Sequence, residues 1–411
     1  MSDSFISNPT SNSSDVVVSF KQVDIIFGDE QARATKLLDD GGTRESILKE
    51  TGAVLGVANA NIDIHEGEIC VLMGLSGSGK STLLRAVNGL NKVTRGEVLV
   101  RHKQGHVDIA SCDATTLREM RTSRIAMVFQ QFALLPWRTV EENVGLGLEL
   151  KGMDKQQRQA IVDEKLKLVD LFQWKTKYAH ELSGGMQQRV GLARAFATDA
   201  DILLMDEPFS ALDPLIRTYL QDFLLDLQRD LKKTIIFVSH DLDEALKLGN
   251  HIAIMEGGHI VQYGEPEQIV LNPANDYVAD FVAHMNPLNV LQGSSFMAPV
   301  DNLPHDDKGN IVLDSQNRYK VKVDAEGMLV SATVDGQPIE ILQCDETTNF
   351  ETMKSNVILS APINLKMRWN IEARFHTGSP VLLVDDGKFT GIIGDDEIYR
   401  GILRQSNASE T

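Results

Sequence analysis

The sequence predicts an α/β fold built around a mainly parallel sheet, and three short apolar runs carry this prediction. They cover residues 69–73, 202–205 and 235–238, and each has the continuous apolar pattern of a strand buried on both faces. A glycine-rich segment follows the first run, two carboxylates follow the second, and a histidine lies just beyond the third. Because ligands gather at the carboxyl ends of parallel strands, we expect these segments to form one site.

The glycine-rich segment 74–82 lies between the first run and a helical pattern at 83–87, which is the order of a phosphate-binding P-loop. Its glycines let backbone N–H groups turn inward around a phosphate, and the helix start adds partial positive charge. Lys80 is expected to reach the β- and γ-phosphates of a nucleoside triphosphate, and the Ser81 hydroxyl to bind Mg²⁺. The residues expected to bind the nucleotide here are Gly74, Leu75, Ser76, Gly77, Ser78, Gly79, Lys80, Ser81 and Thr82.

Two carboxylates follow the apolar run 202–205. Asp206 is placed to hold Mg²⁺, and Glu207, one residue further, to orient and deprotonate an attacking water. An exposed acidic turn after a strand is the alternative explanation, and the P-loop earlier in the chain makes it less favoured. The sequence therefore predicts Asp206 as a metal ligand and Glu207 as a catalytic base.

A second phosphate-binding helix start is predicted at Ser183, Gly184 and Gly185, which open a helical pattern that continues through residues 190–195. One chain with a P-loop and a separate anion-binding helix start has a direct interpretation. The second site serves the γ-phosphate that another copy of the chain holds, across a two-fold dimer. These three residues are therefore predicted to bind the nucleotide as well.

Residues 182–189 resemble the signature motif of ATP-binding-cassette (ABC) ATPases, and the other motifs of that family are present in order. Residues 128–130 resemble the Q-loop, 210–213 the D-loop, and 237–240 the segment of the switch histidine. The resemblance implies an ABC-type P-loop NTPase domain with ATP and Mg²⁺ as cofactors. The chain departs from the commonest signature at Met186, where the family has glutamine; the serine and both glycines are intact, so we expect no catalytic loss.

The resemblance assigns roles to three further residues. Gln130 is implied to reach both the metal and the attacking water beside the membrane subunit, although Gln131 is adjacent. His240 is implied to contact the γ-phosphate as a catalytic residue, although a histidine after a strand is usually a capping or core residue. Asp213, in the D-loop, is implied to belong to the nucleotide site.

Residues 29–56 form an insertion before the next strand pair, in which 32–38 and 44–49 read as two short helices. Taken alone, the insertion is most simply a surface decoration. Together with the P-loop and the signature segment, it resembles the ATPase subunits of bacterial importers for glycine betaine, proline betaine and choline. Phe27 is then the aromatic residue that stacks on adenine, or else a buried core residue.

This resemblance implies an ATP hydrolase coupled to solute import. It implies a homodimer of ATPase subunits that works with a transmembrane permease subunit and a solute-binding protein, peripherally at the cytoplasmic face of the inner membrane. Residues 132–181 are implied to form a helical subdomain that receives a permease helix. Its amphipathic pattern places Val162, Leu166, Val169 and Phe172 on one apolar stripe. Overall likeness favours choline slightly over glycine betaine; an amino acid importer is the nearer alternative, and an ATPase of translation or DNA repair the more distant one.

Composition limits the partners further. The formal net charge of −18 disfavours nucleic acid and anionic lipid as partners held by bulk electrostatics. No run of 18 or more apolar residues occurs, so no direct membrane insertion is expected. Cys70, Cys112 and Cys344 lie far apart, without the spacing of a zinc site or a disulfide framework. Residues 1–15 are rich in serine and asparagine and are expected to be a disordered tail.

Residues 286–411 are expected to form a small C-terminal α+β domain, separate from a nucleotide-binding domain at 16–285. Residues 293–295 read as a linker. Residues 380–394 read as strand, tight turn and strand, with a helix start at 395–398. This ending resembles the regulatory module of the cystathionine-β-synthase type (CBS), which implies a role in sensing ionic strength; a nondescript α+β appendage is the alternative.

Overall fold

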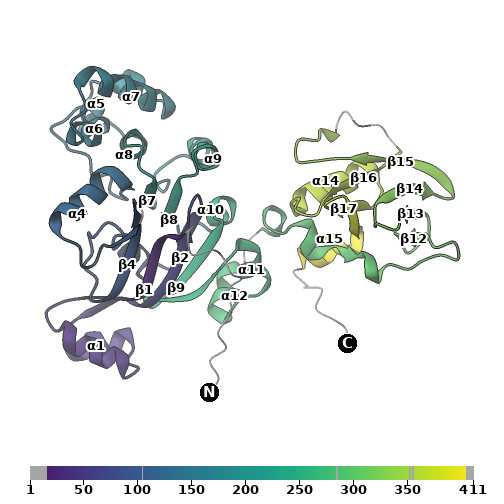
Figure 1. Ribbon diagram of the computed structural model, residues 1–411, viewed down its shortest axis with the longest axis horizontal. Helices are drawn as coiled ribbons and strands as arrows, with labels where there is room; N and C mark the ends of the chain where they lie inside the picture. Colours follow the sequence, from purple (N-terminus) through teal and green to yellow (C-terminus); the bar gives the residue numbers. More distant parts are fainter. Residues whose placement is uncertain (1–15, 104, 284–285, 351–352, 354–355, 404–411) are drawn as a thin grey trace. The chain divides into compact units, whose positions relative to one another are not determined.

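The computed structural model describes residues 16–103, 105–283, 286–350, 353 and 356–403. They form two compact units that divide between Phe281 and Val282, and Val270–Asn272 also belongs to the second unit (Figure 1). Each unit has its own sheet and its own buried core. The tail expected at residues 1–15 lies outside the described residues.

The first unit contains a six-stranded sheet in which five neighbouring strands run parallel. In spatial order its strands are β10 (His259–Gly264), β9 (His251–Glu256), β3 (Ile69–Met73), β8 (Thr234–Val238), β7 (Ile202–Asp206) and β6 (Ile125–Val128). The three predicted apolar runs are the adjacent strands β3, β8 and β7, and every residue in them is buried. The predicted parallel sheet is confirmed, and the three strand ends that carry chemistry are neighbours.

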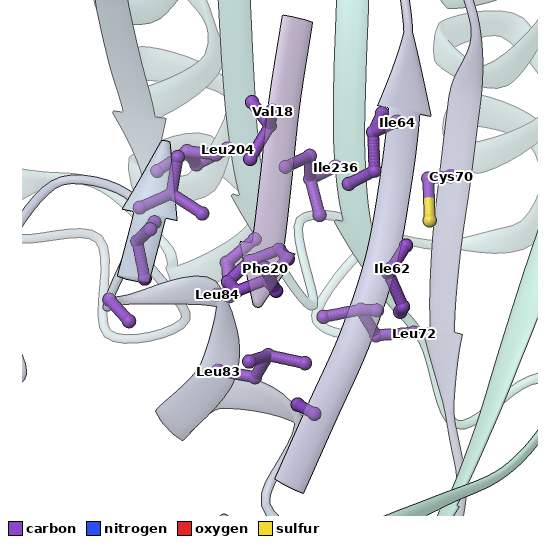
Figure 2. Packing of buried hydrophobic residues seen from close by; sticks show 14 of the residues in the cluster. Val18, Phe20, Ile62, Ile64, Cys70, Leu72, Leu83, Leu84, Leu204 and Ile236 are labelled. Carbon is purple, nitrogen blue, oxygen red and sulfur yellow. The ribbon is translucent and has the colours of Figure 1, made fainter. Parts of the chain in front are cut away.

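A second, antiparallel sheet of the first unit packs against the parallel one. Its strands, in spatial order, are β2 (Val54–His65), β1 (Val16–Phe27), β4 (Arg95–His102) and β5 (Gly105–Asp108). Figure 2 shows side chains from both sheets and from helix α3 (Lys80–Leu84) packed into one core. Cys70 of β3 is buried in this core, as expected, and all three cysteines are free thiols. The helix that follows the P-loop is therefore fixed by hydrophobic contacts with two sheets.

The remaining helices of the first unit surround these sheets. They are α1 (Gln31–Asp39), α2 (Arg44–Thr51), α4 (Ala114–Glu119), the π-helix η1 (Met120–Arg124), α5 (Val140–Val144), α6 (Leu146–Leu150), α7 (Lys155–Leu168), the 3₁₀ turns η2 (Phe172–Trp174) and η3 (Ala179–Glu181), α8 (Gly184–Ala197), α9 (Pro214–Leu231) and α10 (Leu242–Leu248). Helices α11 (Pro266–Leu271) and α12 (Asp276–Val282) lie around the division between the units. In the part of the chain described here, no helix is long and apolar enough to cross a membrane.

The region predicted as a helical subdomain contains α5, α6 and α7, which pack on one another and on α8 (Figure 1). The predicted apolar stripe is correct at Val162 and Leu166, which are buried on α7. The predicted continuation to Phe172 is wrong, because α7 ends at Leu168. Asp170 adopts a left-handed conformation with φ of 55°, and the N–H of Leu171 donates to the Leu166 carbonyl over 2.8 Å, which closes the helix.

The two helices predicted in the insertion are present as α1 and α2. Thr43 caps α2 by accepting a hydrogen bond from the Ser46 N–H, and Gly52 ends it with φ of 69°. The helices cover the end of the antiparallel sheet through a small buried cluster. Its members are Ile26, Ala34, Ile47, Ala53, Leu55 and Ala58. The insertion is therefore packed onto the sheet and does not extend freely from it.

The second unit is built on one eight-stranded sheet. In spatial order its strands are β11 (Ala298–Pro299), β18 (Lys388–Ile393), β17 (Val381–Asp385), β16 (Val357–Pro362), β15 (Gln337–Gln343), β14 (Leu329–Val334), β13 (Tyr319–Val323) and β12 (Ile311–Val312). Its helices are α13 (Gly293–Phe296), α14 (Met367–Thr377) and α15 (Asp395–Ile402), with 3₁₀ turns η4 (Pro287–Asn289) and η5 (Val300–Asn302). Strands β15, β16 and β17 run parallel, and the other neighbours are antiparallel.

The last part of this unit has the order β16, α14, β17, β18, α15, which extends the predicted strand–turn–strand–helix by one strand and one helix. The linker predicted at residues 293–295 is wrong, because these residues begin α13. Gly293 is buried, and a Cβ added there would lie 2.8 Å from the Leu383 side chain and 3.0 Å from the Ile363 carbonyl. This glycine allows close packing. A glycine- and serine-rich composition alone does not show whether such a residue packs closely or belongs to a flexible linker.

Candidate nucleotide-binding site

The P-loop connects the end of β3 to the start of α3. Two of its glycines make approaches that a side chain would block. A Cβ on Gly74 would lie 2.1 Å from the Met255 carbonyl oxygen, and one on Gly79 would lie 2.4 Å from the Gly56 carbonyl oxygen. Both glycines also have positive φ, of 136° and 107°. Neighbouring backbone on two sides therefore holds the loop in the shape of a cradle.

Lys80 lies at the base of this cradle and is only 6% exposed. Its Nζ donates to the carbonyl oxygens of Gly74 at 2.7 Å and Leu75 at 2.9 Å. Burial lowers the pKa of Lys80, and the negative charges of Glu207 and Asp206 oppose that shift. The Ser78 hydroxyl is buried in the same loop without a hydrogen-bond partner among the described residues. A cation and an unpartnered hydroxyl in a glycine cradle fit a bound phosphate chain.

Asp206, at the end of β7, is fully buried and accepts hydrogen bonds on both oxygens. Ser81 Oγ donates to Oδ1 at 2.7 Å, and Arg85 Nη2 donates to Oδ2 at 2.8 Å. The structure thus brings two of the three residues predicted to bind Mg²⁺ into direct contact, and the third, Gln130, contacts Glu207. Arg85 was not predicted from the sequence. It lies one turn after Ser81, and its partner is more than 100 residues away in the sequence.

Three predicted catalytic residues meet at the carboxylate of Glu207. Gln130 Nε2 donates to Glu207 Oε2 at 2.9 Å, and His240 Nδ1 lies 3.5 Å from the same oxygen. Gln130, and not the exposed Gln131, makes this contact. His240 is 63% exposed, so the ring faces solvent and is not a core residue. These three side chains come from the ends of β6, β7 and β8, which are neighbouring strands.

The backbone of Glu207 is in the left-handed region, with φ of 48°. Such a conformation costs about 1–2 kcal/mol for a residue with a Cβ. Hydrogen bonds offset the cost, because the Glu207 N–H donates to the Val238 carbonyl over 3.1 Å and its carbonyl accepts from Ser210 Oγ at 3.0 Å. This turn aims the side chain away from the strand, toward Gln130 and His240.

Gln188 also supports this turn, and sequence reasoning missed it. Its side chain is completely buried on α8; Nε2 donates to the Glu207 carbonyl at 3.2 Å, and Oε1 accepts from the Ala211 N–H at 3.1 Å. One amide therefore joins helix α8 to the backbone turn at Glu207 and to the N–H of Ala211. The sequence shows only a glutamine near the polar start of a helix. Its burial, which is what implies hydrogen-bond partners, becomes visible only in the structure.

Next to His240 in the chain lies a buried carboxylate network around Glu244. Ser239 Oγ donates to Glu244 Oε2 at 2.5 Å, and Gln221 Nε2 donates to Oε1 at 3.0 Å. Burial raises the pKa of Glu244; the two hydrogen bonds oppose the shift, and Asp241 adds to it. A small cavity beside this network is lined by Glu207, His240 and Glu244 among others. The network fixes the strand end that carries His240.

The signature segment lies at the surface. Ser183 caps α8 by accepting a hydrogen bond from the Met186 N–H at 3.4 Å, and Gly184 and Gly185 follow at the exposed to half-buried helix start. Across the described residues, no hydrogen bond or ion pair joins residues 183–185 to the P-loop. Asp213 is likewise exposed and caps α9 through the Ile216 N–H. The structure therefore separates these predicted site residues from the P-loop of the same chain.

Phe27, at the end of β1, is 40% exposed, so it is not a buried core residue. Its position above the P-loop follows from Gly56, where an added Cβ would lie 2.9 Å from the Phe27 ring and 3.0 Å from Thr82 Cγ2. The ring is thus next to the last residue of the P-loop, with a free surface. That placement is compatible with stacking on a nucleotide base.

Comparisons with known proteins agree with this geometry. Residues 57–210 match the ABC transporter family. The glycine betaine/carnitine transport ATP-binding protein GbuA of Listeria monocytogenes is 42% identical over 90% of this chain and 93% of its own length. The glycine betaine transport ATP-binding protein OpuAA of Bacillus subtilis is 42% identical over 90% of this chain and 88% of its own length.

Two further similarities cover about three fifths of this chain. The glycine betaine/proline betaine transport ATP-binding protein ProV of Escherichia coli is 53% identical over 62% of this chain and 63% of its own length. A solved dimeric structure of the ATP-binding cassette MJ0796, in a post-hydrolysis state with ADP and phosphate, is 31% identical with a TM-score of 0.53. It covers 61% of this chain and 98% of its own.

Proposed function

This chain belongs to the ABC transporter family as an ATP-binding subunit of the glycine betaine and osmoprotectant type, and from that membership we propose that it hydrolyses ATP to drive import of quaternary ammonium solutes. The observation that carries the proposal is the meeting of Gln130 and His240 at one oxygen of Glu207. A carboxylate held by a glutamine and a histidine at the ends of neighbouring strands can accept a proton from an attacking water.

The P-loop is proposed to hold the phosphates of ATP. Its backbone N–H groups and the Lys80 ammonium would supply positive charge to the β- and γ-phosphates. Phe27 is proposed to stack on the adenine. The residues proposed to hold Mg²⁺ are Ser81, Asp206 and Gln130, since the first two are already in contact and the third points to the same end of the sheet. Bound Mg²⁺ would neutralise charge that develops on the phosphates.

Glu207 is proposed as the base that takes a proton from water at Oε2 as the water oxygen attacks the γ-phosphorus. Gln130 orients the water, and His240 donates to a γ-phosphate oxygen, which stabilises the charge in the transition state. Gln188 and Ser210 take no part in the chemical step. Their hydrogen bonds hold the backbone turn that presents the Glu207 carboxylate. As the bond from the water oxygen to the γ-phosphorus forms, the bond from the γ-phosphorus to the β,γ-bridging oxygen would break, and ADP and inorganic phosphate would leave. The free energy comes from this net hydrolysis of ATP.

The signature segment is proposed to act across a homodimer. Ser183, Gly184 and Gly185 lie at the surface end of α8 on this chain, and the similar cassette MJ0796 is dimeric. Two copies facing each other would place the signature helix start of one, with its Asp213 segment, against the γ-phosphate on the P-loop of the other. Hydrolysis would then require the closed dimer, and ATP would act first as a ligand of that closed state.

The proposed partners are a transmembrane permease subunit and a solute-binding protein, with the chain peripheral at the cytoplasmic face of the inner membrane. The two relatives aligned over 90% of this chain are both named for glycine betaine, and one of them also for carnitine, which favours glycine betaine over choline as the solute. The second unit is proposed to regulate transport. Its run of strand, helix, two strands and helix from Val357 to Ile402 resembles a single CBS motif, and deletion of residues 286–411 should weaken the dependence of transport on salt.

Uptake of labelled glycine betaine and labelled choline tests the proposal. Cells that lack this chain would receive the wild type, Glu207→Gln, or the control Glu340→Gln, which alters an exposed carboxylate of the second unit. Wild type and control should restore uptake of one solute, and Glu207→Gln should not. Purified Glu207→Gln should bind ATP within about twofold of wild type and hydrolyse it at least about 100-fold more slowly. Near-normal hydrolysis by this variant would refute the role of Glu207 as base.

A further inference from the structure

The insertion at residues 29–56 contacts the P-loop through one side chain. Arg44, the first residue of α2, donates from Nη1 to the carbonyl oxygen of Gly77, which lies 33 residues further along the chain. Gly77 is at the exposed outer side of the loop, and a Cβ added to it would meet nothing within 4 Å. The loop is thus open on this side, and the guanidinium of Arg44 is the group that reaches it.

Arg44 is presented by a backbone that is fixed at several points. Ile47, one turn along α2, is completely buried in the cluster that joins the insertion to the sheet. At the end of α1, Asp39 pairs with Arg95 Nη2 at 2.8 Å, and Arg95 Nε pairs with the buried Asp24 at 2.6 Å. These contacts attach both helices of the insertion to the antiparallel sheet. The guanidinium therefore approaches the P-loop from a fixed direction.

The contact reaches the lysine of the P-loop through one peptide group. The Gly77 carbonyl points to Arg44, and the N–H of the same peptide, on Ser78, donates to the Leu75 carbonyl over 3.1 Å. That Leu75 carbonyl also accepts from Lys80 Nζ at 2.9 Å. Because a trans peptide is planar, with its C=O and N–H pointing in opposite directions, holding the carbonyl also holds the N–H. Arg44 thus constrains the peptide that faces the lysine.

We propose that Arg44 is a positioning residue for the phosphates of the bound nucleotide. Through the Gly77–Ser78 peptide it holds the P-loop in the shape that accepts phosphate, and its charge lies on the outer side of the same loop. This inference rests on the proposed ATPase function and extends it, since it makes the insertion part of the nucleotide site. It predicts an effect on binding affinity that depends on the phosphates of the nucleotide and not on its adenine.

The test is nucleotide binding by the purified full chain and its Arg44 variants, measured by titration with ATP, ADP and adenosine. Arg44→Ala should lower the affinity for ATP and ADP about five- to tenfold, since one charge-assisted hydrogen bond is lost at a half-exposed position. Adenosine, which has no phosphate, should bind equally to wild type and variant. The rate at saturating ATP should change less than about twofold, because the Glu207 carboxylate is untouched.

Two further variants make the outcome specific. Arg44→Lys should recover part of the ATP affinity, because an ammonium can still donate to the carbonyl. Arg33→Ala removes an arginine of α1 that pairs with Glu30 at the surface and should bind ATP like wild type. Unchanged ATP affinity in Arg44→Ala would overturn the proposal, and so would an equal loss for adenosine or an equal loss in Arg33→Ala. If the wild type fails to bind or hydrolyse ATP, the proposed function fails; otherwise only the role of Arg44 is at stake.

Discussion

Two serine- and glycine-bearing segments of the chain each open a helix, and their surroundings differ. At the base of the P-loop, Gly74, Ser78 and Lys80 are buried, and the backbone of Met255 and Gly56 closes around them. The segment from Ser183 to Gly185 lies at the surface and is capped mainly by its own serine. The first is enclosed within this chain, and the second lies exposed to half-buried at its surface. We propose that the same helix-start chemistry serves a nucleotide bound by this chain at the P-loop and a nucleotide held by a second copy at residues 183–185.

The sharpest way to break this comparison is to disable each segment separately. Ser183→Arg should leave ATP affinity within about twofold of wild type and reduce ATP hydrolysis about 100-fold, because a phosphate donor is replaced by a bulky side chain. Lys80→Ala should abolish ATP binding as well as hydrolysis. Equilibrium titration and a phosphate-release assay distinguish the two variants.

Mixing these two variants tests whether the segments act between copies. A mixed dimer holds one intact P-loop, from the Ser183→Arg chain, opposite one intact signature segment, from the Lys80→Ala chain. Hydrolysis should reappear on mixing, although neither variant is active alone. Ser183→Arg that retains full activity, or a mixture that stays inactive while dimers form, would show that the two segments do not meet across copies.

A smaller effect is expected where the signature helix joins the catalytic turn. Gln188→Met keeps the length of the side chain and removes both hydrogen bonds, to the Glu207 carbonyl and from the Ala211 N–H. We expect about a tenfold lower rate at saturating ATP with unchanged ATP affinity, since the turn and not the P-loop is disturbed. Gln187→Met is the matched control, because the Gln187 side chain donates to the Leu182 carbonyl and not to the turn at Glu207. Equal losses in the two variants would argue against a special role for Gln188.

The smallest expected effect concerns the buried carboxylate behind His240. A pKa raised in the folded state means that the fold holds the proton of Glu244 more tightly than the unfolded chain does. The resulting stabilisation is complete below the ordinary pKa of 4.5 and is lost as pH rises through the folded pKa. Glu244→Gln removes this loss, which is about 1.4 kcal/mol for each tenfold difference in proton affinity between the folded and unfolded chain. Its free energy of unfolding should therefore rise relative to wild type from pH 4 to pH 8; a constant difference would contradict the assignment.

The sequence predicted the parts of the site that are local in the chain. A strand, a loop and a helix within twenty residues carry the P-loop, and an apolar run followed by two carboxylates carries Asp206 and Glu207. Both helices of the insertion and the strand pattern near the C-terminus were also predicted. In each case the sequence signal is a short hydrophobic period or a turn residue. Both depend on residues that are neighbours in the chain.

The residues that escaped prediction have partners far away in the sequence. Arg85 reaches Asp206, and Arg44 reaches Gly77, and nothing in the local pattern around either arginine indicates its partner. The end of α7 depended on Asp170 adopting a left-handed conformation, which aspartate permits but does not require. Tertiary contacts decided these cases.

The support of the P-loop has a consequence for how small a working fragment can be. The N–H of Gly258 donates to the Ser78 carbonyl over 3.1 Å, and the Gly258 carbonyl accepts from the Ala58 N–H over 2.9 Å. This hairpin tip between β9 and β10 lies beyond residue 210, the last residue matched to the ABC transporter family in residues 57–210. A fragment trimmed to residues 57–210 would retain the P-loop, the segment of Gln130, the segment of Ser183 and the two carboxylates Asp206 and Glu207. It would lose Asp213, His240 and one wall of the cradle. The segment whose sequence identifies the family is therefore shorter than the segment needed to build the P-loop site.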